Sequence, residues 1–200
     1  MKKRSKWLDS ILWSCGSLGG GVIYLVTAQL SFALTESFAM SAAYVGIVFL
    51  VSRFFDGITD VIAGTIIDRT NLKIGKARIY DLFMIVAWAF VVLCFRVPGS
   101  LSEMGKLIFV FVMYNMYTSV FATFAGCAET VRLKRSLSED GRLHAVAVSG
   151  VITSIVSVAL SIGMPILVAI YGSQPGGWTK IILIFAIPSS VLALIRFLWV

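Results

Sequence analysis

Residues 42–70 read AAYVGIVFLVSRFFDGITDVIAGTIIDRT, an apolar run of helical length that carries charges near its middle. Arg53, Asp56 and Asp60 follow one another at spacings of three and four residues, and Gly64 comes four residues later. In a helix this spacing places them on one face. Each charge at a bilayer centre costs about 2.5–3.5 kcal/mol on insertion scales. We therefore expect this face to line a bundle interior or a water-filled cavity, and not to face lipid.

The composition of the whole chain is typical of a membrane protein. Of its 200 residues, 58% are hydrophobic and 14% are charged, and the mean hydropathy is +0.93. Soluble domains contain about 45–50% apolar and about 25% charged residues, and one soluble core of this size could not bury so much apolar surface. The composition excludes an ordinary soluble enzyme, a disordered chain and a disulfide-rich secreted domain. It predicts an all-α polytopic membrane protein.

Six segments are long and apolar enough to predict transmembrane helices, because a hydrocarbon core of about 30 Å needs about 20 helical residues. The predicted helices cover residues 11–34, 42–67, 79–97, 107–128, 145–170 and 179–198. We expect them to form a single six-helix domain over residues 1–200. The start MKKRSK before an apolar run resembles a signal peptide, but Asp9 interrupts the transition and the run is too long, so the first helix is expected to be retained.

The lysines and arginines predict how these helices are oriented. Twelve of them lie in the N-terminal segment and in the connections between helices two and three and between helices four and five, against three in the other connections. The twelve are Lys2, Lys3, Arg4, Lys6, Arg69, Lys73, Lys76, Arg78, Arg132, Lys134, Arg135 and Arg142, and the three are Arg96, Lys106 and Lys180. Basic residues concentrate on the cytoplasmic side. Both termini are therefore expected in the cytoplasm, with the chain in the cytoplasmic membrane, and the net charge of +7 needs no nucleic-acid partner.

The two carboxylates of the charged face predict an ion site. Asp56 and Asp60 lie one turn apart and repel each other unless a cation or a proton is bound. Hard oxygen ligands suit Na⁺ or Li⁺, whereas a carboxyl group that readily binds a proton suits H⁺. Arg53 provides a partial counter-charge. The alternative is an internal ion pair that only fixes helix packing, in a non-transporting assembly or regulatory module.

The sequence contains no motif of a hydrolase, a zinc enzyme or a nucleotide-binding protein. We expect neither an enzyme nor a cofactor, apart from a coupling cation. In the fourth predicted helix, several residues are polar for the middle of a membrane and are candidates to contact substrate or ion, namely Tyr114, Asn115, Tyr117, Thr118 and Ser119. At the end of the second, Gly64 is expected to let a neighbouring helix approach closely.

The stretch from Arg53 to Thr70, RFFDGITDVIAGTIIDRT, together with the turn that follows it, resembles the glycoside–pentoside–hexuronide:cation symporters of the major facilitator superfamily. The resemblance covers the whole chain as the N-terminal half of such a protein. The residues of the turn motif are Gly64, Asp68, Arg69, Gly75 and Arg78. In that family the paired aspartates of helix two bind Na⁺, Li⁺ or H⁺, which implies this role for Asp56 and Asp60.

The resemblance also implies further site residues. A threonine of the fourth helix contributes to the cation site and corresponds to Thr118, and the polar residue before the second aspartate corresponds to Thr59. The acidic residues that hold sugar hydroxyls in galactoside-transporting members fall on Gly20 and Phe121, so an α-galactoside is not expected. A larger or differently charged glycoside is implied instead. The implied substrate cavity contains Gly20, Tyr24, Tyr114, Asn115 and Phe121.

Length is the other departure from the family. Its members have two six-helix halves with the substrate held between them, and this chain covers one half. We expect it to work with a second copy or with a separate six-helix half, or to be a truncated form.

Overall fold

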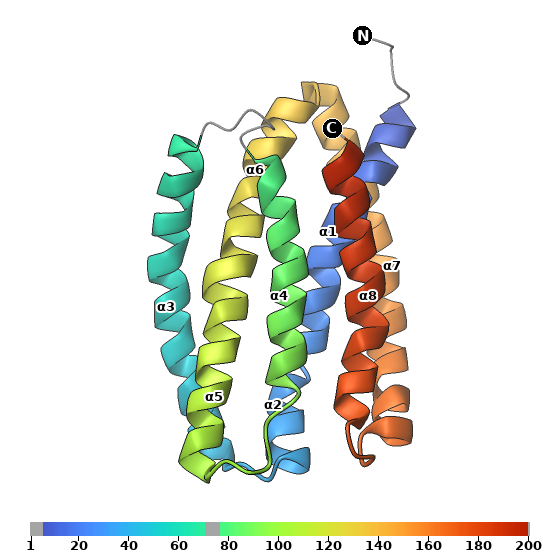
Figure 1. Ribbon diagram of the computed structural model, residues 1–200. Helices are drawn as coiled ribbons and strands as arrows, with labels where there is room; N and C mark the ends of the chain where they lie inside the picture. Colours follow the sequence, from blue (N-terminus) through green and yellow to red (C-terminus); the bar gives the residue numbers. More distant parts are fainter. Residues whose placement is uncertain (1–5, 71–76, 200) are drawn as a thin grey trace.

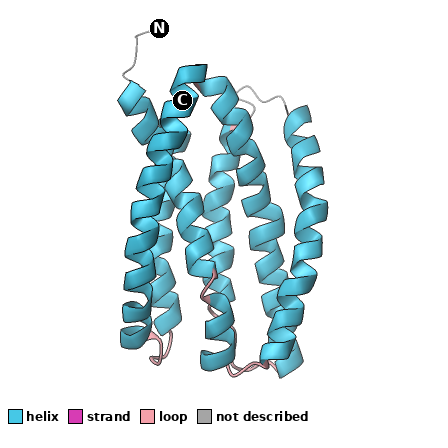
Figure 2. Cartoon of the chain, turned by 180° about the vertical axis from the view of Figure 1, so that it is seen from behind, coloured by secondary structure: helices cyan, strands magenta, loops and turns pink. Residues whose placement is uncertain are grey.

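The computed structural model describes residues 6–70 and 77–199, which are mostly helical and contain no strand (Figures 1 and 2). The helices form six rods, and three of these contain a change of helix type. The rods are α1 (Lys6–Thr27) with α2 (Leu30–Phe32) and a π-helical turn (Ala33–Ser37); α3 (Ala42–Arg69); a 3-10 turn (Arg78–Tyr80) with α4 (Asp81–Cys94); α5 (Glu103–Asn115) with a π-helical segment (Met116–Ala122) and α6 (Thr123–Ser136); α7 (Glu139–Tyr171); and α8 (Gly177–Trp199).

Each predicted segment falls on one of these rods, and the rods extend beyond most of the predicted bounds. Helix α7, for example, begins at Glu139 because the Ser138 hydroxyl accepts a hydrogen bond from the Gly141 N–H, a cap that apolar periodicity does not reveal. Four rods are long and apolar enough to cross a membrane: Lys6–Ser37, Glu103–Lys134, Glu139–Tyr171 and Gly177–Trp199. The charged α3 and the 14-residue α4 are not among them. That α3 and α4 cross the membrane stays a prediction.

The rods lie side by side, with both ends of the chain at the same end of the bundle (Figure 1). Helix α1 packs against α7 and α8, and α4 contacts α8 on one side and the α5–α6 rod on the other. Helix α3 lies at the edge and packs mainly on the α5–α6 rod. The charged helix is thus attached to the rest of the bundle chiefly through a single neighbour.

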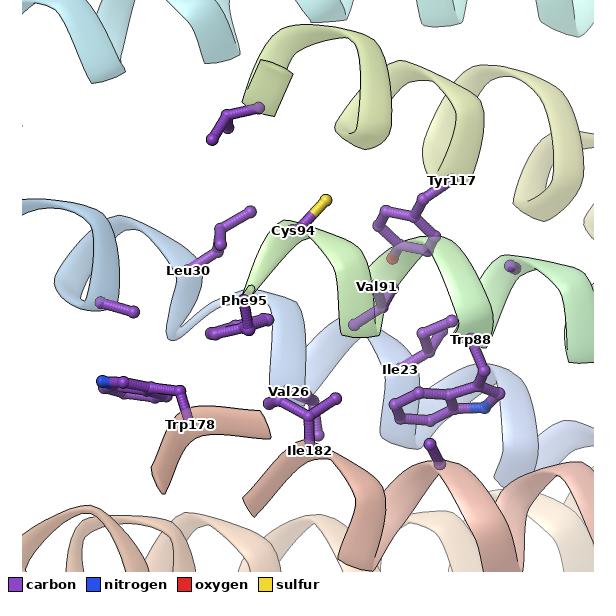
Figure 3. Packing of buried hydrophobic residues seen from close by; sticks show 14 of the residues in the cluster. Ile23, Val26, Leu30, Trp88, Val91, Cys94, Phe95, Tyr117, Trp178 and Ile182 are labelled. Atoms are coloured by element: carbon purple, nitrogen blue, oxygen red, sulfur yellow. The ribbon is translucent and has the colours of Figure 1, made fainter. Parts of the chain in front are cut away.

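The apolar core is centred on α4, between α1, α8 and the α5–α6 rod (Figure 3). Trp88 and Val91 are buried here against residues of α1 such as Ile23. Phe95 stacks on Trp178, with ring centroids 5.5 Å apart. Because α4 contacts both sides of the bundle, it fixes α1 relative to the α5–α6 rod.

Large apolar side chains also cover the outer faces of the bundle. On α3 and α7 they include Phe54, Val61, Ile155 and Ile162, each more than 60% exposed. Exposed apolar surface of this extent marks a contact with lipid or with another protein. Together with the four apolar rods, it identifies a multi-pass membrane protein.

A buried ion cluster joins three helices at the end of the bundle where the termini lie. The Asp81 carboxylate of α4 contacts the guanidinium groups of Arg132 on α6 and Arg196 on α8, the latter with 2.9 Å between Nη2 and Oδ1. All three residues are only 4% exposed. The prediction that Arg132 lies in a loop is therefore wrong, because ion pairing lets α6 continue through it to Ser136.

The cluster extends to α1 through Glu129. Arg196 Nη1 lies 3.2 Å from Glu129 Oε1, which also accepts a hydrogen bond of 2.9 Å from the Ser17 hydroxyl. Arginines of two other helices bind the last carbonyl groups of α8: Arg132 Nη2 donates to Arg196 O and Arg78 Nε donates to Phe197 O, both at 2.6 Å. The last carbonyls of a helix have no partner within it. These contacts therefore fix the end of α8 against its neighbours.

Candidate functional site

A row of hydrogen bonds joins α3 to the α5–α6 rod. Three residues of α3, one turn apart, each bond to the residue 63 positions further along the chain. The pairs are Ser52 with Asn115, Asp56 with Ser119, and Asp60 with Thr123. We call this row the polar ladder. The constant offset means that the two rods run in the same direction, as Figure 1 shows.

The middle rung holds Asp56 from two sides. The Ser119 hydroxyl donates a hydrogen bond of 2.6 Å to Asp56 Oδ1, a length typical of a charge-assisted bond to a carboxylate. Arg53 Nη1 lies 3.6 Å from Asp56 Oδ2. The Asp56 side chain is 18% exposed and that of Arg53 is 74% exposed, so this ion pair reaches the surface of the chain.

The rung at Asp60 is looser. The Thr123 hydroxyl donates to Asp60 Oδ1 over 3.2 Å, and Asp60 is exposed in the chain. Its carboxylate is therefore held by a longer bond and is more accessible than that of Asp56.

The third rung is uncharged and buried. Asn115 Nδ2 donates to the Ser52 hydroxyl oxygen over 2.9 Å and to Phe111 O over 2.7 Å. Ser52 is completely buried, and a buried polar group is stable only when it is hydrogen-bonded. This rung therefore fixes the register in which α3 meets the α5–α6 rod.

A change of helix type keeps the ladder aligned. In an α-helix with 3.6 residues per turn, residues four apart drift around the axis by about 40° per step. The segment Met116–Ala122 is π-helical, and its wider turns reduce this drift for Asn115, Ser119 and Thr123. Single π-helical turns are rare in proteins, and those that do occur are often found at functional sites.

A cavity of about 300 Å³ opens beside the ladder. Its walls come from α1, α3 and the α5–α6 rod and combine both aspartates with tyrosine and threonine side chains. The lining residues are Tyr24, Thr27, Ala28, Arg53, Asp56, Asp60, Tyr114, Tyr117, Thr118 and Thr123. A larger cavity of about 830 Å³ lies between the α7–α8 turn and the Ala33–Ser37 turn, and none of the predicted site residues line it.

The two threonines that the resemblance implies as ligands bind the backbone of their own helices. Thr118 lines the cavity, and its hydroxyl donates to Tyr114 O over 3.1 Å. The Thr59 hydroxyl is within hydrogen-bond distance of Phe55 O and Asp56 O. Their role as ligands stays a prediction.

Sequence reasoning named Ser119 only as one of several polar residues of the fourth helix and missed Thr123, whereas the structure places both on the two carboxylates. A signal was present, because Asn115, Ser119 and Thr123 repeat at the four-residue spacing of Ser52, Asp56 and Asp60.

Two of the five residues predicted for the substrate cavity line it, namely Tyr24 and Tyr114. Asn115 lies in the polar ladder. Phe121 packs against the core, where its ring stacks on Phe90 with centroids 5.4 Å apart. Gly20 faces α4, and a Cβ built on it would lie 3.8 Å from Met84 Cε. The substrate contact predicted for these residues stays a prediction.

The turn motif is placed only in part. Asp68 and Arg69 form the exposed end of α3, and Arg78 binds the end of α8 as described above. Around Gly64, a built Cβ would meet no atom of the described residues within 4 Å outside its own helix, so the expected close approach of a neighbouring helix is wrong within this chain. Gly75 lies outside the described residues, as do the basic residues Lys2, Lys3, Arg4, Lys73 and Lys76.

The described residues thus form a bundle of apolar helices with a carboxylate-lined cavity, typical of a polytopic membrane protein. The sequence family described as MFS/sugar transport protein matches residues 12–200. The chain therefore belongs to this family of the major facilitator superfamily. It is similar to the glycoside–pentoside–hexuronide:cation symporters.

The chain is similar to several bacterial proteins named as transporters or symporters. It is 30% identical over 214 residues to the isoprimeverose transporter of Lactiplantibacillus pentosus, a match covering 98% of this chain and 42% of that protein. It is 37% identical over 125 residues to the uncharacterized symporter YnaJ of Bacillus subtilis, a match covering 60% of this chain and 26% of that protein. It is 34% identical over 115 residues to the putative glycoside/cation symporter YagG of Escherichia coli, a match covering 56% of this chain and 25% of that protein. The chain thus spans less than half the length of each of these relatives.

Proposed function

We propose that this chain forms the cation-binding half of a symporter that carries a glycoside or a related sugar across the cytoplasmic membrane together with Na⁺, Li⁺ or H⁺. The observation that carries the proposal is the meeting of Asp56 and Asp60 with hydroxyl groups of a second helix at a cavity lined by tyrosines. The names of the similar proteins support a sugar as substrate.

In the proposed mechanism the cation neutralises the two aspartates and draws α3 towards the α5–α6 rod. The same rod carries Tyr114 and Tyr117 into the cavity, so an ion that orders it also orders the surface that meets the substrate. Thermodynamic linkage requires the reverse effect as well: bound substrate must tighten cation binding by the same factor.

Transport itself needs a second unit. A cavity of about 300 Å³ is at the lower end of the range of about 300–1,000 Å³ for ligand pockets, and the exposed apolar faces of α3 and α7 leave room for a partner. We propose that six helices with both termini in the cytoplasm pack against a second six-helix half or a second copy. Rocking of the two units would then expose the cavity to either side.

The cation part of the proposal can be tested on the purified chain in detergent by its melting temperature in Na⁺, in Li⁺ and in a bulky organic cation, each at several pH values. A ligand at 100 times its dissociation constant stabilises the folded state by about 2.7 kcal/mol. We expect Na⁺ or Li⁺ to raise the melting temperature of the wild type and to have no effect on the melting temperature of Asp60→Asn. Asp140→Asn, which changes an exposed aspartate far from the ladder, should respond like the wild type.

The same measurement distinguishes the alternative of a packing role. A structural ion pair predicts that Asp60→Asn unfolds or melts lower in every buffer. The proposal would be contradicted if the wild type folded but its melting temperature showed no Asp60-dependent response to these ions or to pH.

A further inference from the structure

We propose that the larger cavity, of about 830 Å³, holds the headgroup of a zwitterionic phospholipid, with Arg96 against its phosphate and Glu36 against its ammonium group. The cavity lies between the Ala33–Ser37 turn, the end of α4 and the α7–α8 turn. These segments are at the end of the bundle opposite to the chain termini (Figure 1). The cavity shares no lining residue with the cavity beside the polar ladder, and the inference does not rest on the proposed cation site.

The cavity lies at the depth of the headgroup region of a bilayer. Helix α8 has 23 residues and is therefore about 35 Å long at about 1.5 Å per residue, slightly more than the hydrocarbon core of about 30 Å. Trp178 and Trp199 lie at its two ends, and tryptophan is enriched at both membrane–water interfaces. Because Trp178 is part of the cavity wall, the opening of the cavity is at the level of the lipid headgroups.

The wall around Trp178 is held in place by three segments of the chain. Its indole Nε1 donates a hydrogen bond of 2.7 Å to the Ser37 hydroxyl, and its ring stacks on Phe95. The ring of Phe32 lies 6.2 Å from that of Trp178, between centroids. Trp178 is only 3% exposed, whereas Phe32 is 49% exposed. The wall is thus fixed, and Phe32 presents an apolar surface beside it on which the acyl chains of a lipid can begin.

Two opposite charges line the same cavity. Glu36 belongs to the Ala33–Ser37 turn, and Arg96 follows the end of α4. Both residues are exposed. Within residues 6–70 and 77–199, neither side chain forms an ion pair. An acidic and a basic group are therefore both available to a ligand in this cavity.

Together, the two charges favour a ligand that is itself a zwitterion. An anion alone would pair with Arg96 but would meet Glu36 as a like charge, which is unfavourable. A metal cation would have only one carboxylate among the described lining residues, whereas hard cations take several oxygen ligands. An uncharged sugar would leave both charges without a counter-charge.

A phosphate next to an ammonium group matches both side chains. Arginine binds phosphate oxygens through paired hydrogen bonds, and a carboxylate accepts hydrogen bonds from an ammonium group. At the depth of the headgroups, the bilayer itself supplies this combination of charges. The apolar surface of Phe32 favours the lipid over a soluble zwitterion, because the latter has no apolar chain to bury there.

The test measures the binding of soluble lipid analogues to the purified full chain in a polyoxyethylene detergent by isothermal titration calorimetry. Dihexanoylphosphatidylethanolamine is the zwitterionic lipid, and dihexanoylphosphatidylglycerol is the anionic lipid. Glycerophosphoethanolamine has the zwitterionic headgroup without acyl chains. The detergent n-octyl β-glucoside represents an uncharged sugar with an apolar chain. The melting temperature shows whether each variant is folded.

We expect the wild type to bind the zwitterionic lipid at least about fivefold more tightly than each of the other three probes. Arg96→Gln should weaken the binding of both lipids about fivefold, the effect of one basic residue near a lipid surface, and Arg96→Lys, which keeps the charge, should weaken it less. Glu36→Gln should abolish the preference for the zwitterionic lipid, because it removes the repulsion of the anionic one.

Glu103→Gln and Lys106→Gln are the matched controls. They remove charges of α5 at the same end of the bundle, outside the cavity lining. Both should bind the two lipids with wild-type affinity and preference. A general effect of charge on lipid or detergent binding would change these variants as well.

Four results would overturn the inference. The first is a folded wild type that does not bind the zwitterionic lipid, and the second is equal affinity for the two lipids. The third is equal affinity for glycerophosphoethanolamine or octyl glucoside, which would assign the cavity to a soluble zwitterion or to a sugar. The fourth is unchanged binding in both Arg96→Gln and Glu36→Gln, which would place the lipid elsewhere. None of these measurements involves the polar ladder, so the cation proposal is tested independently.

Discussion

The guanidinium group of Arg196 lies against the backbone of Gly16, in the space that a side chain on residue 16 would occupy. The missing side chain lets a charged residue of α8 reach between the helices and pair with Asp81 and Glu129. The ring of Trp13 lies 5.4 Å from the same guanidinium. The buried ion cluster therefore depends on one glycine of α1 as much as on its charges.

Gly16→Ala is expected to destabilise the bundle. The new methyl group would clash with Nε, Cζ and Cδ of Arg196, and overpacking of this kind costs about 1–3 kcal/mol. Gly46→Ala on α3 is the matched control, because a Cβ there meets no atom of the described residues within 4 Å outside its own helix and alanine favours a helix over glycine by about 1 kcal/mol. Melting temperatures should fall for the first variant and stay level or rise for the second. Equal shifts would contradict this account of Gly16.

Asp81→Asn should lower the stability of the fold more than is usual for so conservative a substitution. The change removes the charge shared by two buried guanidinium groups, and breaking a buried ion pair costs about 3–5 kcal/mol. Asp140→Asn removes an exposed pair with Lys6, with 4.0 Å between charged atoms, and surface pairs contribute about 0–1 kcal/mol. Denaturant unfolding in detergent measures both. A small effect of Asp81→Asn would mean that the cluster adds little to stability.

The proposed orientation can be tested by cysteine labelling in intact cells. After replacement of Cys15 and Cys127, which are not fully buried, single cysteines are introduced in the α4–α5 connection (Ser100→Cys) and at the start of α7 (Glu139→Cys). A membrane-impermeant thiol reagent should label the first from outside and the second only after the cells are opened. The reverse pattern would place the termini outside.

Tyr24 is expected to contact the sugar and not the ion. It lines the cavity from α1, and its ring is largely exposed in the isolated chain. Aromatic rings bind through an apolar face and a polar hydroxyl, a combination that suits a glycoside. Tyr24→Ala should lower glycoside affinity about tenfold, equivalent to about 1.4 kcal/mol, and leave Na⁺ affinity unchanged. Tyr44→Ala, an exposed tyrosine of α3 outside the cavity lining, is the control.

Much of the architecture could be predicted from sequence because it depends on local pattern. The spacing of Arg53, Asp56 and Asp60 placed them on one face of a helix, and the structure brings that face to a cavity. The apolar runs located the rods of the described residues, four of which are long and apolar enough to cross a membrane. These features follow from helical periodicity and hydropathy, which a single sequence displays directly.

The partners of these charges could not be predicted in the same way. Thr118 lines the same cavity as the aspartates, but the hydroxyls that contact the carboxylates are those of Ser119 and Thr123. Arg132 was assigned to a loop because its partners, Asp81 and Arg196, are distant in sequence. These pairings are determined only by the three-dimensional packing.

The central claim is that Asp56 and Asp60 bind the coupling cation, and equilibrium binding of radioactive sodium to the purified chain tests it most directly. The account predicts saturable Na⁺ binding that is lost in folded Asp56→Asn and Asp60→Asn chains. Sodium binding of wild-type affinity in Asp60→Asn would contradict it.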